Sequence, residues 1–107
     1  MTSRARISMP AQAKRGEVIE IRAIVSHTME TGFRRTDRGA TIPRDIIDLF
    51  VCSYNGVEVF RAELYPSISA NPYLAFSTVA TESGTLQFRW SGDNGFTLTE
   101  TATIQVA

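Results

Sequence analysis

The side chains best suited to nucleophilic catalysis are scarce in this sequence, which holds one histidine, His27, and one cysteine, Cys52. Brought together by a fold, they could form a thiolate–imidazole pair. However, Cys52 lies within the apolar run 46–54, and a cysteine in such surroundings usually packs as a small hydrophobe with a raised pKa. We therefore expect no catalytic residue, and expect Cys52 to be a buried free thiol rather than part of an intersubunit disulfide.

His27, Met29 and Cys52 also offer the ligand types of a blue-copper site. Such a site needs a second histidine, which the sequence lacks, and a structural zinc site would need four thiolate or imidazole ligands. Glycine-rich phosphate-binding motifs are absent as well. We expect no metal and no other cofactor, and keep a copper-binding redox β-sandwich as the weaker alternative.

Four arginines gather in the segment 27–45, which shows neither strand nor helix periodicity. Irregular segments of this length are usually functional or disordered. Guanidinium groups bind carboxylates and oxyanions through paired hydrogen bonds, so we interpret the segment as a partner-binding loop. A solvated hairpin without a role and a disordered loop remain alternatives. The candidate contact residues are His27, Met29, Glu30, Arg34, Arg35, Arg38 and Arg44.

A second candidate contact is the turn at Asn71 and Tyr73, which flank Pro72 and would display an aromatic ring. The alternative is a tyrosine buried at a corner of the fold.

The elements that must position these residues are strands. Apolar residues alternate with polar ones at Ile19, Ile21, Ala23 and Val25, the period of a half-buried strand. The run 46–54 is apolar on both parities, which suits a strand covered on both faces. Asn-Gly at 55–56 predicts a type I′ hairpin turn. The predicted strands are 4–9, 17–26, 46–54, 57–64, 74–80, 85–90 and 96–106.

About seven short strands with tight turns predict one all-β domain over residues 1–107, an immunoglobulin-like antiparallel β-sandwich. A formal net charge of +0 gives no reason to expect binding to nucleic acid or to an anionic membrane. No apolar run approaches the roughly 20 residues of a membrane span. The basic N-terminus lacks the apolar stretch of a signal peptide, so composition alone points to the cytosol.

Several short motifs follow one another along the chain. They are GEVIEIR at 16–22, SHTMETG at 26–32, the arginine pair 34–35, IPR at 42–44, NG at 55–56, ANPYL at 70–74 and SGT at 83–85. Their order and spacing resemble the SoxZ family from about residue 4 to residue 107, and several spaced motifs are more specific than any one of them. One departure is Thr28, where the family often has proline.

The resemblance implies a heterodimer with SoxY, whose C-terminal Gly-Gly-Cys-Gly-Gly arm carries thiosulfate-derived intermediates between periplasmic Sox enzymes. This chain ends at 103–107 without such an arm, so the resemblance implies a non-catalytic subunit that supports SoxY and meets other Sox enzymes transiently. It also implies a periplasmic location, reached by export in complex with SoxY, which overrides the cytosolic expectation. A SoxZ-like paralogue in another oxidation pathway is the alternative.

Overall fold

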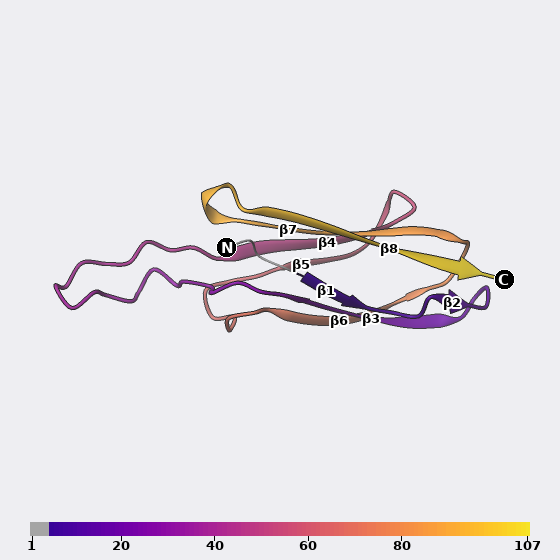
Figure 1. Ribbon diagram of the computed structural model, residues 1–107, viewed down its shortest axis with the longest axis horizontal. Coiled ribbons are helices and arrows are strands. Elements are labelled where there is room, and N and C mark those ends of the chain that lie inside the picture. Colours follow the sequence, from indigo (N-terminus) through magenta and orange to yellow (C-terminus); the bar gives the residue numbers. More distant parts are fainter. Residues whose placement is uncertain (1–4) are drawn as a thin grey trace.

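Two β-sheets packed face to face make up the computed structural model, which describes residues 5–107 (Figure 1). Its elements are β1 (Ala5–Ser8), β2 (Gln12–Ala13), β3 (Val18–Val25), β4 (Ile47–Tyr54), β5 (Val57–Glu63), β6 (Tyr73–Val79), β7 (Gly84–Gly92), the 3-10 turn η1 (Asp93–Gly95) and β8 (Thr97–Val106). The predicted all-β sandwich is confirmed. Arg4, the first residue of the first predicted strand, lies outside the described residues.

The three-stranded sheet has the order β1-β3-β6, and the five-stranded sheet has the order β2-β8-β7-β4-β5. All seven predicted strands are present, with bounds shifted by a few residues. The sequence pattern does not predict β2, because its two residues are too few to show a period. They pair in parallel with the end of β8, Gln12 beside Gln105 and Ala13 beside Val106.

Alternation along the strands fills the space between the sheets. On β3 the side chains of Ile19, Ile21, Ala23 and Val25 are at most 1% exposed, and those between them face outward. Each buried isoleucine or valine among them contributes roughly 1.5–3 kcal/mol to folding.

Aromatic rings close the sandwich at its β5–β6 edge. Phe60 on β5 stacks on Phe76 of β6, with ring centroids 4.2 Å apart and planes 5° apart. Phe50, fully buried on β4, lies beside both of these rings and beside Trp90. The two sheets are therefore joined by an aromatic cluster as well as by aliphatic contacts.

The predicted turn at Asn55 and Gly56 is confirmed, since both residues have positive φ, 47° and 83°. The side chain of Asn55 also accepts a hydrogen bond from the backbone N–H of Thr85 at 2.9 Å. A Cβ on Gly84 would come within 1.9 Å of that side-chain oxygen, so the close approach of the turn to β7 requires glycine there.

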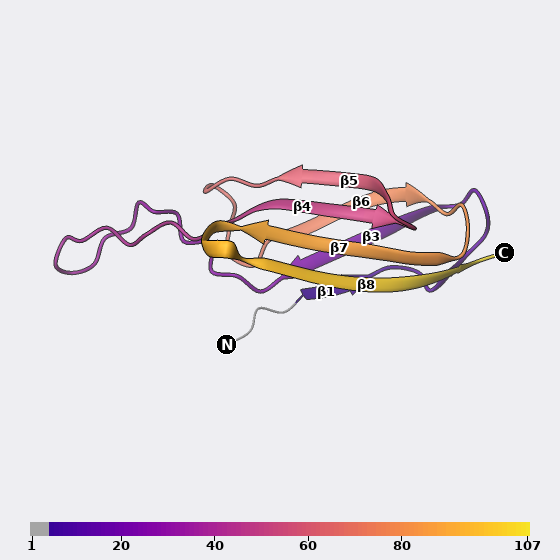
Figure 2. The same cartoon turned by 90° about the horizontal axis from the view of Figure 1, so that it is seen from above.

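The expectation that β4 is covered on both faces is wrong for this chain. Figure 2 looks onto the outer face of the five-stranded sheet, with β5, β4, β7 and β8 in front of the other sheet. Leu49 and Val51 point to that outer face and are only half-buried. Within residues 5–107, no helix has the length and hydrophobicity of a membrane span.

Candidate partner-binding site

Residues 30–45 leave the sandwich as a narrow hairpin, here called the arm (Figure 1). Glu30 and Asp45 exchange two backbone hydrogen bonds of 2.8 Å at its base, and the N–H of Ile42 donates to the carbonyl of Arg34 at 2.8 Å farther out. The arm makes the molecule elongated, with extents of 60 × 21 × 19 Å. The structure therefore gives this segment a hydrogen-bonded hairpin in place of a disordered loop.

His27 and Met29 lie at the base of the arm and hold it in place. The backbone N–H of Met29 donates to Nδ1 of His27 at 3.0 Å, and the imidazole packs edge-on against Phe96 with centroids 5.0 Å apart. Met29 has a positive φ of 55°, and its sulfur accepts a hydrogen bond from the N–H of Ile47 at 3.2 Å. Both side chains are almost fully buried, 6% and 4% exposed, so their role here is to position the arm.

Asn71, just before β6, fixes the same base from the strand that neighbours β3 in the three-stranded sheet. Its side-chain oxygen accepts a hydrogen bond from the N–H of His27 at 2.9 Å, and its own N–H donates to the carbonyl of His27 at 2.7 Å. Asn71 also has a positive φ of 55°, a conformation that asparagine tolerates better than most residues. The structure thus joins two of the sequence candidates in one anchor.

Arg44 forms an ion pair with Asp93 of the same chain. Its Nε and Nη2 donate to the two carboxylate oxygens at 2.8 and 2.9 Å, the bidentate geometry of the strongest ion pairs. The carboxylate also accepts the N–H of Ile46 at 3.1 Å. These hydrogen bonds, that from Arg44 above all, hold the pKa of Asp93 below its usual value. Sequence reasoning missed Asp93, because a turn aspartate gives no signal that it will reach a side chain 49 residues away.

Arg34 has a partner within the arm. Its Nη2 lies 2.7 Å from Oε1 of Glu30, and this hydrogen bond lowers the pKa of the glutamate. The arginine side chain is 66% exposed, so the pair contributes little to stability while it orients both groups.

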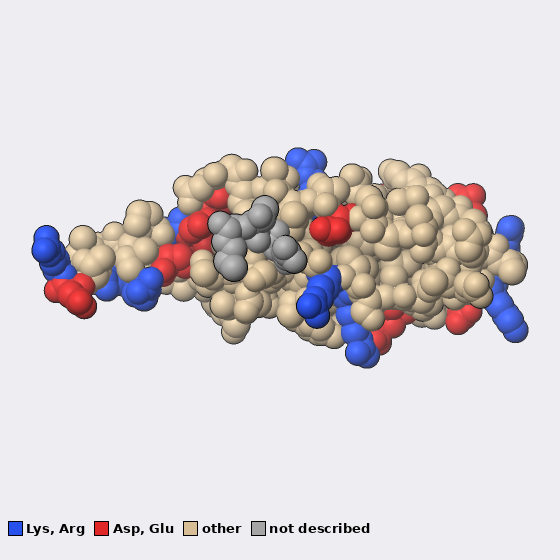
Figure 3. Space-filling model, in the orientation of Figure 1, with Lys and Arg blue, Asp and Glu red and all other residues tan. Residues whose placement is uncertain are grey.

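The side chains of the arm that are exposed to a partner lie on its outer part. Phe33 is 83% exposed, and Arg35 and Arg38 are exposed as well. Figure 3 shows basic and acidic side chains at the far end of the arm, away from the sandwich. Sequence reasoning missed Phe33, although it is the one large apolar residue in 30–41, a segment that shows neither strand nor helix periodicity.

Tyr73 lies outside this cluster, on the outer face of the three-stranded sheet. It is 56% exposed and pairs across the strands with Ile24, which is 38% exposed. The alternative of a buried tyrosine at a corner is therefore wrong.

Cys52 is fully buried on β4, and burial raises the pKa of its thiol to about 12. The sulfur of Met29 contacts Ile47, and Cys52 lies five residues farther along the strand, about 16 Å away at the usual strand rise. The copper alternative would require His27, Met29 and Cys52 to meet, and the fold separates them. No group of three or more His, Cys, Asp or Glu residues in the described range could hold a metal ion.

Among solved structures, the superoxide reductase (neelaredoxin) from Ignicoccus hospitalis superposes with a TM-score of 0.75 at 18% identity, covering 96% of this chain and 80% of that one. The sulfur carrier protein SoxY from Chlorobium limicola f thiosulfatophilum superposes with a TM-score of 0.66 at 11% identity, covering 96% and 78%. At these identities the likeness shows the sandwich fold alone. No curated protein sequence matches the chain.

A family model described as sulphur oxidation protein SoxZ matches residues 6–103. This match begins within β1, ends within β8 and includes the arm together with the His27, Asn71 and Asp93 anchors at its base. The chain belongs to the SoxZ family of sulphur oxidation proteins.

Proposed function

We propose that this chain is the non-catalytic subunit of a SoxYZ-type carrier complex in thiosulfate oxidation. It pairs with a SoxY-type subunit, which carries the sulfur intermediates covalently, and has no enzymatic activity of its own. Membership of the SoxZ family supports a role in the Sox system. SoxY from Chlorobium limicola f thiosulfatophilum has the same sandwich fold, so the proposal is a pair of similar sandwiches.

The observation that carries the proposal is the anchored arm with an exposed aromatic ring and exposed guanidinium groups. Aromatic residues and arginines are enriched at the centre of protein interfaces and supply much of the binding energy there. Because backbone hydrogen bonds and buried anchors already order the arm, binding costs less conformational entropy than it would for a flexible loop. We expect Phe33 to enter an apolar pocket of the partner, with Arg35 and Arg38 reaching carboxylates at its rim.

The location follows from the same proposal. The complex works in the periplasm, and the chain arrives there in association with its partner, through which it also meets other Sox enzymes. Cell fractionation with and without the partner gene tests this: loss of the chain from the periplasm without SoxY is the expected result.

The first test is to express the chain with the SoxY-type protein of its own organism and to determine the intact mass of the purified complex. We expect a 1:1 pair whose partner ends in a Gly-Cys-Gly-Gly sequence. Wild-type chain that does not bind this partner would contradict the proposal.

Variants then test the arm. We expect Phe33→Ala to weaken partner binding at least about tenfold, the usual effect of removing an interface anchor. Arg35→Ala with Arg38→Ala should weaken binding less and reduce its dependence on salt concentration. Arg15→Ala is the matched control, because this exposed arginine lies near the C-terminal residue Ala107, at the opposite end of the sandwich. Equal affinities for all variants would show that the arm is not part of the interface.

A further inference from the structure

The outer face of the five-stranded sheet departs from the pattern of a solvated sheet. In antiparallel sheets with one wet face, outward positions are normally polar, as Gln87, Arg89 and Ser91 are on β7. On the neighbouring strand β4, the outward positions hold Leu49 and Val51 instead. No element of the described residues lies over them (Figure 2).

The strand register places charges of both signs beside this apolar centre, since Glu63 of β5 lies opposite Leu49. Val51 lies opposite Arg89 of β7 on one side and opposite Arg61 of β5 on the other. Arg61 is paired with Glu58, Nη2 to Oε1 at 2.8 Å. Arg89 has no carboxylate within 4.0 Å among residues 5–107. A valine flanked by two exposed guanidinium groups, one of them unpaired within the described chain, is a suitable seat for a partner carboxylate.

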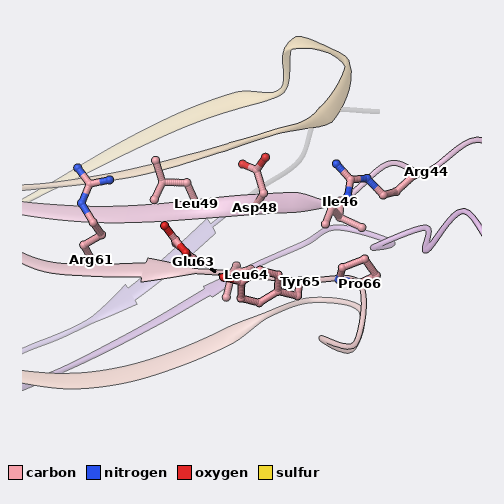
Figure 4. A pocket seen from close by; sticks show the side chains of 9 residues that line it. All are labelled: Arg44, Ile46, Asp48, Leu49, Arg61, Glu63, Leu64, Tyr65 and Pro66. Atoms are coloured by element: carbon pink, nitrogen blue, oxygen red, sulfur yellow. Dashed lines mark hydrogen bonds between the residues drawn. The ribbon is translucent and has the colours of Figure 1, made fainter.

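Two adjoining hollows shape this face into a groove. One of about 390 Å³ lies over Val51, Arg61 and Arg89. The other, of about 410 Å³, extends to Arg44 at the base of the arm (Figure 4). Leu49 and Arg61 line both hollows, and Figure 4 shows their side chains on neighbouring strands, so the groove is continuous from the arm to the middle of the sheet.

We propose that this groove on β4, β5 and β7 is the docking surface for the SoxY-type partner. An apolar side chain of the partner covers Leu49, and a carboxylate of the partner lies over Val51 between Arg61 and Arg89. The inference rests on the proposed function, because it takes the partner to be the SoxY-type subunit. Continuity of the groove with the base of the arm lets one partner contact both.

A second copy of this chain fits the groove poorly when its strands run parallel or antiparallel to those below. In a symmetric face-to-face dimer centred on Val51, with the two-fold axis along or across the strands, Arg61 and Arg89 would meet Arg61 or Arg89 of the copy. Like charges facing each other across an interface cost several kcal/mol. The groove therefore favours a chain that presents a carboxylate opposite Arg61 and Arg89 over a copy docked in these orientations.

The test uses Val51→Asp, which places a carboxylate where we expect that of the partner. The new aspartate can pair with Arg61 and Arg89 across the strands, so the fold is retained while docking is blocked. Arg89→Glu is the second variant and reverses the charge without touching the apolar centre. The matched controls are Ser77→Asp and Arg6→Glu, exposed positions on the outer face of the other sheet.

Affinity for the purified SoxY-type partner is measured by titration calorimetry, and thermal melts check that each variant is folded. We expect Val51→Asp and Arg89→Glu to weaken binding at least about tenfold, as interface anchors do, and both controls to stay within about twofold. If the wild type binds and both groove variants bind equally well, the groove is overturned while the proposed function stands. If the wild type does not bind, the proposed function fails and the inference fails with it. A wild-type homodimer that Val51→Asp dissociates would overturn the choice of partner.

Discussion

The sandwich and the arm are built from the same chain but held by different forces. In the sandwich, Phe50, Phe88 and Trp90 are completely buried, and the ring of Phe50 packs against the other two. In the arm, the ring of Phe33 is 83% exposed, and order comes from backbone hydrogen bonds across the hairpin and from the anchors at its base. The sandwich is therefore stabilised by apolar burial and the arm by a small number of polar contacts.

This difference separates stability from binding. Residues that determine whether the chain folds lie between the sheets, whereas the exposed residues of the arm and of the groove can change without loss of the fold. Substitutions in the two regions should give opposite results in assays of unfolding and of partner binding.

The largest effect expected is that of Phe50→Ala. Removing a buried ring that contacts Phe60, Phe76, Phe88 and Trp90 should lower the free energy of unfolding by about 3–5 kcal/mol. Urea unfolding followed by tryptophan fluorescence measures this loss. An effect no greater than that of Leu49→Ala, on the half-buried outer face of the same strand, would contradict the proposed division between core and surface.

Sequence patterns predicted the sandwich better than the arm, for a physical reason. Side chains that alternate between core and solvent leave a period of two, as at Ile19 and Ile21, and Asn55 with Gly56 provides the φ angles of the hairpin turn. The order of the arm comes from backbone groups and from Asp93, which is distant in sequence. Neither leaves a periodic trace, so the arm could be identified only as an irregular, arginine-rich segment.

The candidate residues show the same limit. Sequence reasoning selected Arg44 and Asn71 for residue type and position. In the structure, both side chains form hydrogen bonds within the chain, Arg44 with Asp93 and Asn71 with His27. The outward-facing apolar residues Leu49 and Val51 belong to a run that the sequence shows to be apolar at both odd and even positions. Their meaning depends on which face the second sheet covers, and that is a property of topology rather than of local pattern.

The next effect concerns alkaline pH and the sandwich. The folded chain keeps the Cys52 proton up to a pKa of about 12, whereas the unfolded chain releases it near pH 9, so stability present below pH 9 is lost as pH rises between these values. At pH 10.5 the loss amounts to about 2 kcal/mol. Urea unfolding at pH 8 and at pH 10.5 should show a smaller loss for Cys52→Ala than for the wild type. Parallel losses in the two proteins would show that the thiol is not the cause.

A smaller and more local effect concerns acid pH and the arm. Arg44 holds the pKa of Asp93 below its usual value, so the stabilisation is present at neutral pH and is lost as pH falls through the lowered pKa. Asp93→Asn should reproduce this loss at neutral pH, and hydrogen exchange at the Glu30 and Asp45 amides should become several-fold faster. Amides of β3 should keep their protection. Equal acceleration in β3 would mean that the anchor supports the whole fold rather than the arm.

The smallest effect expected on folding is that of Phe33→Ala. An aromatic ring that is 83% exposed loses little contact with the protein when it is removed, so the free energy of unfolding should change by less than about 0.5 kcal/mol. The same substitution should weaken partner binding at least about tenfold, whereas a core residue should affect unfolding more than binding. Urea unfolding and calorimetric titration of one preparation give both numbers. A destabilisation comparable to that of Phe50→Ala would show that Phe33 packs against the chain, and the arm would then be part of the fold rather than a surface for a partner.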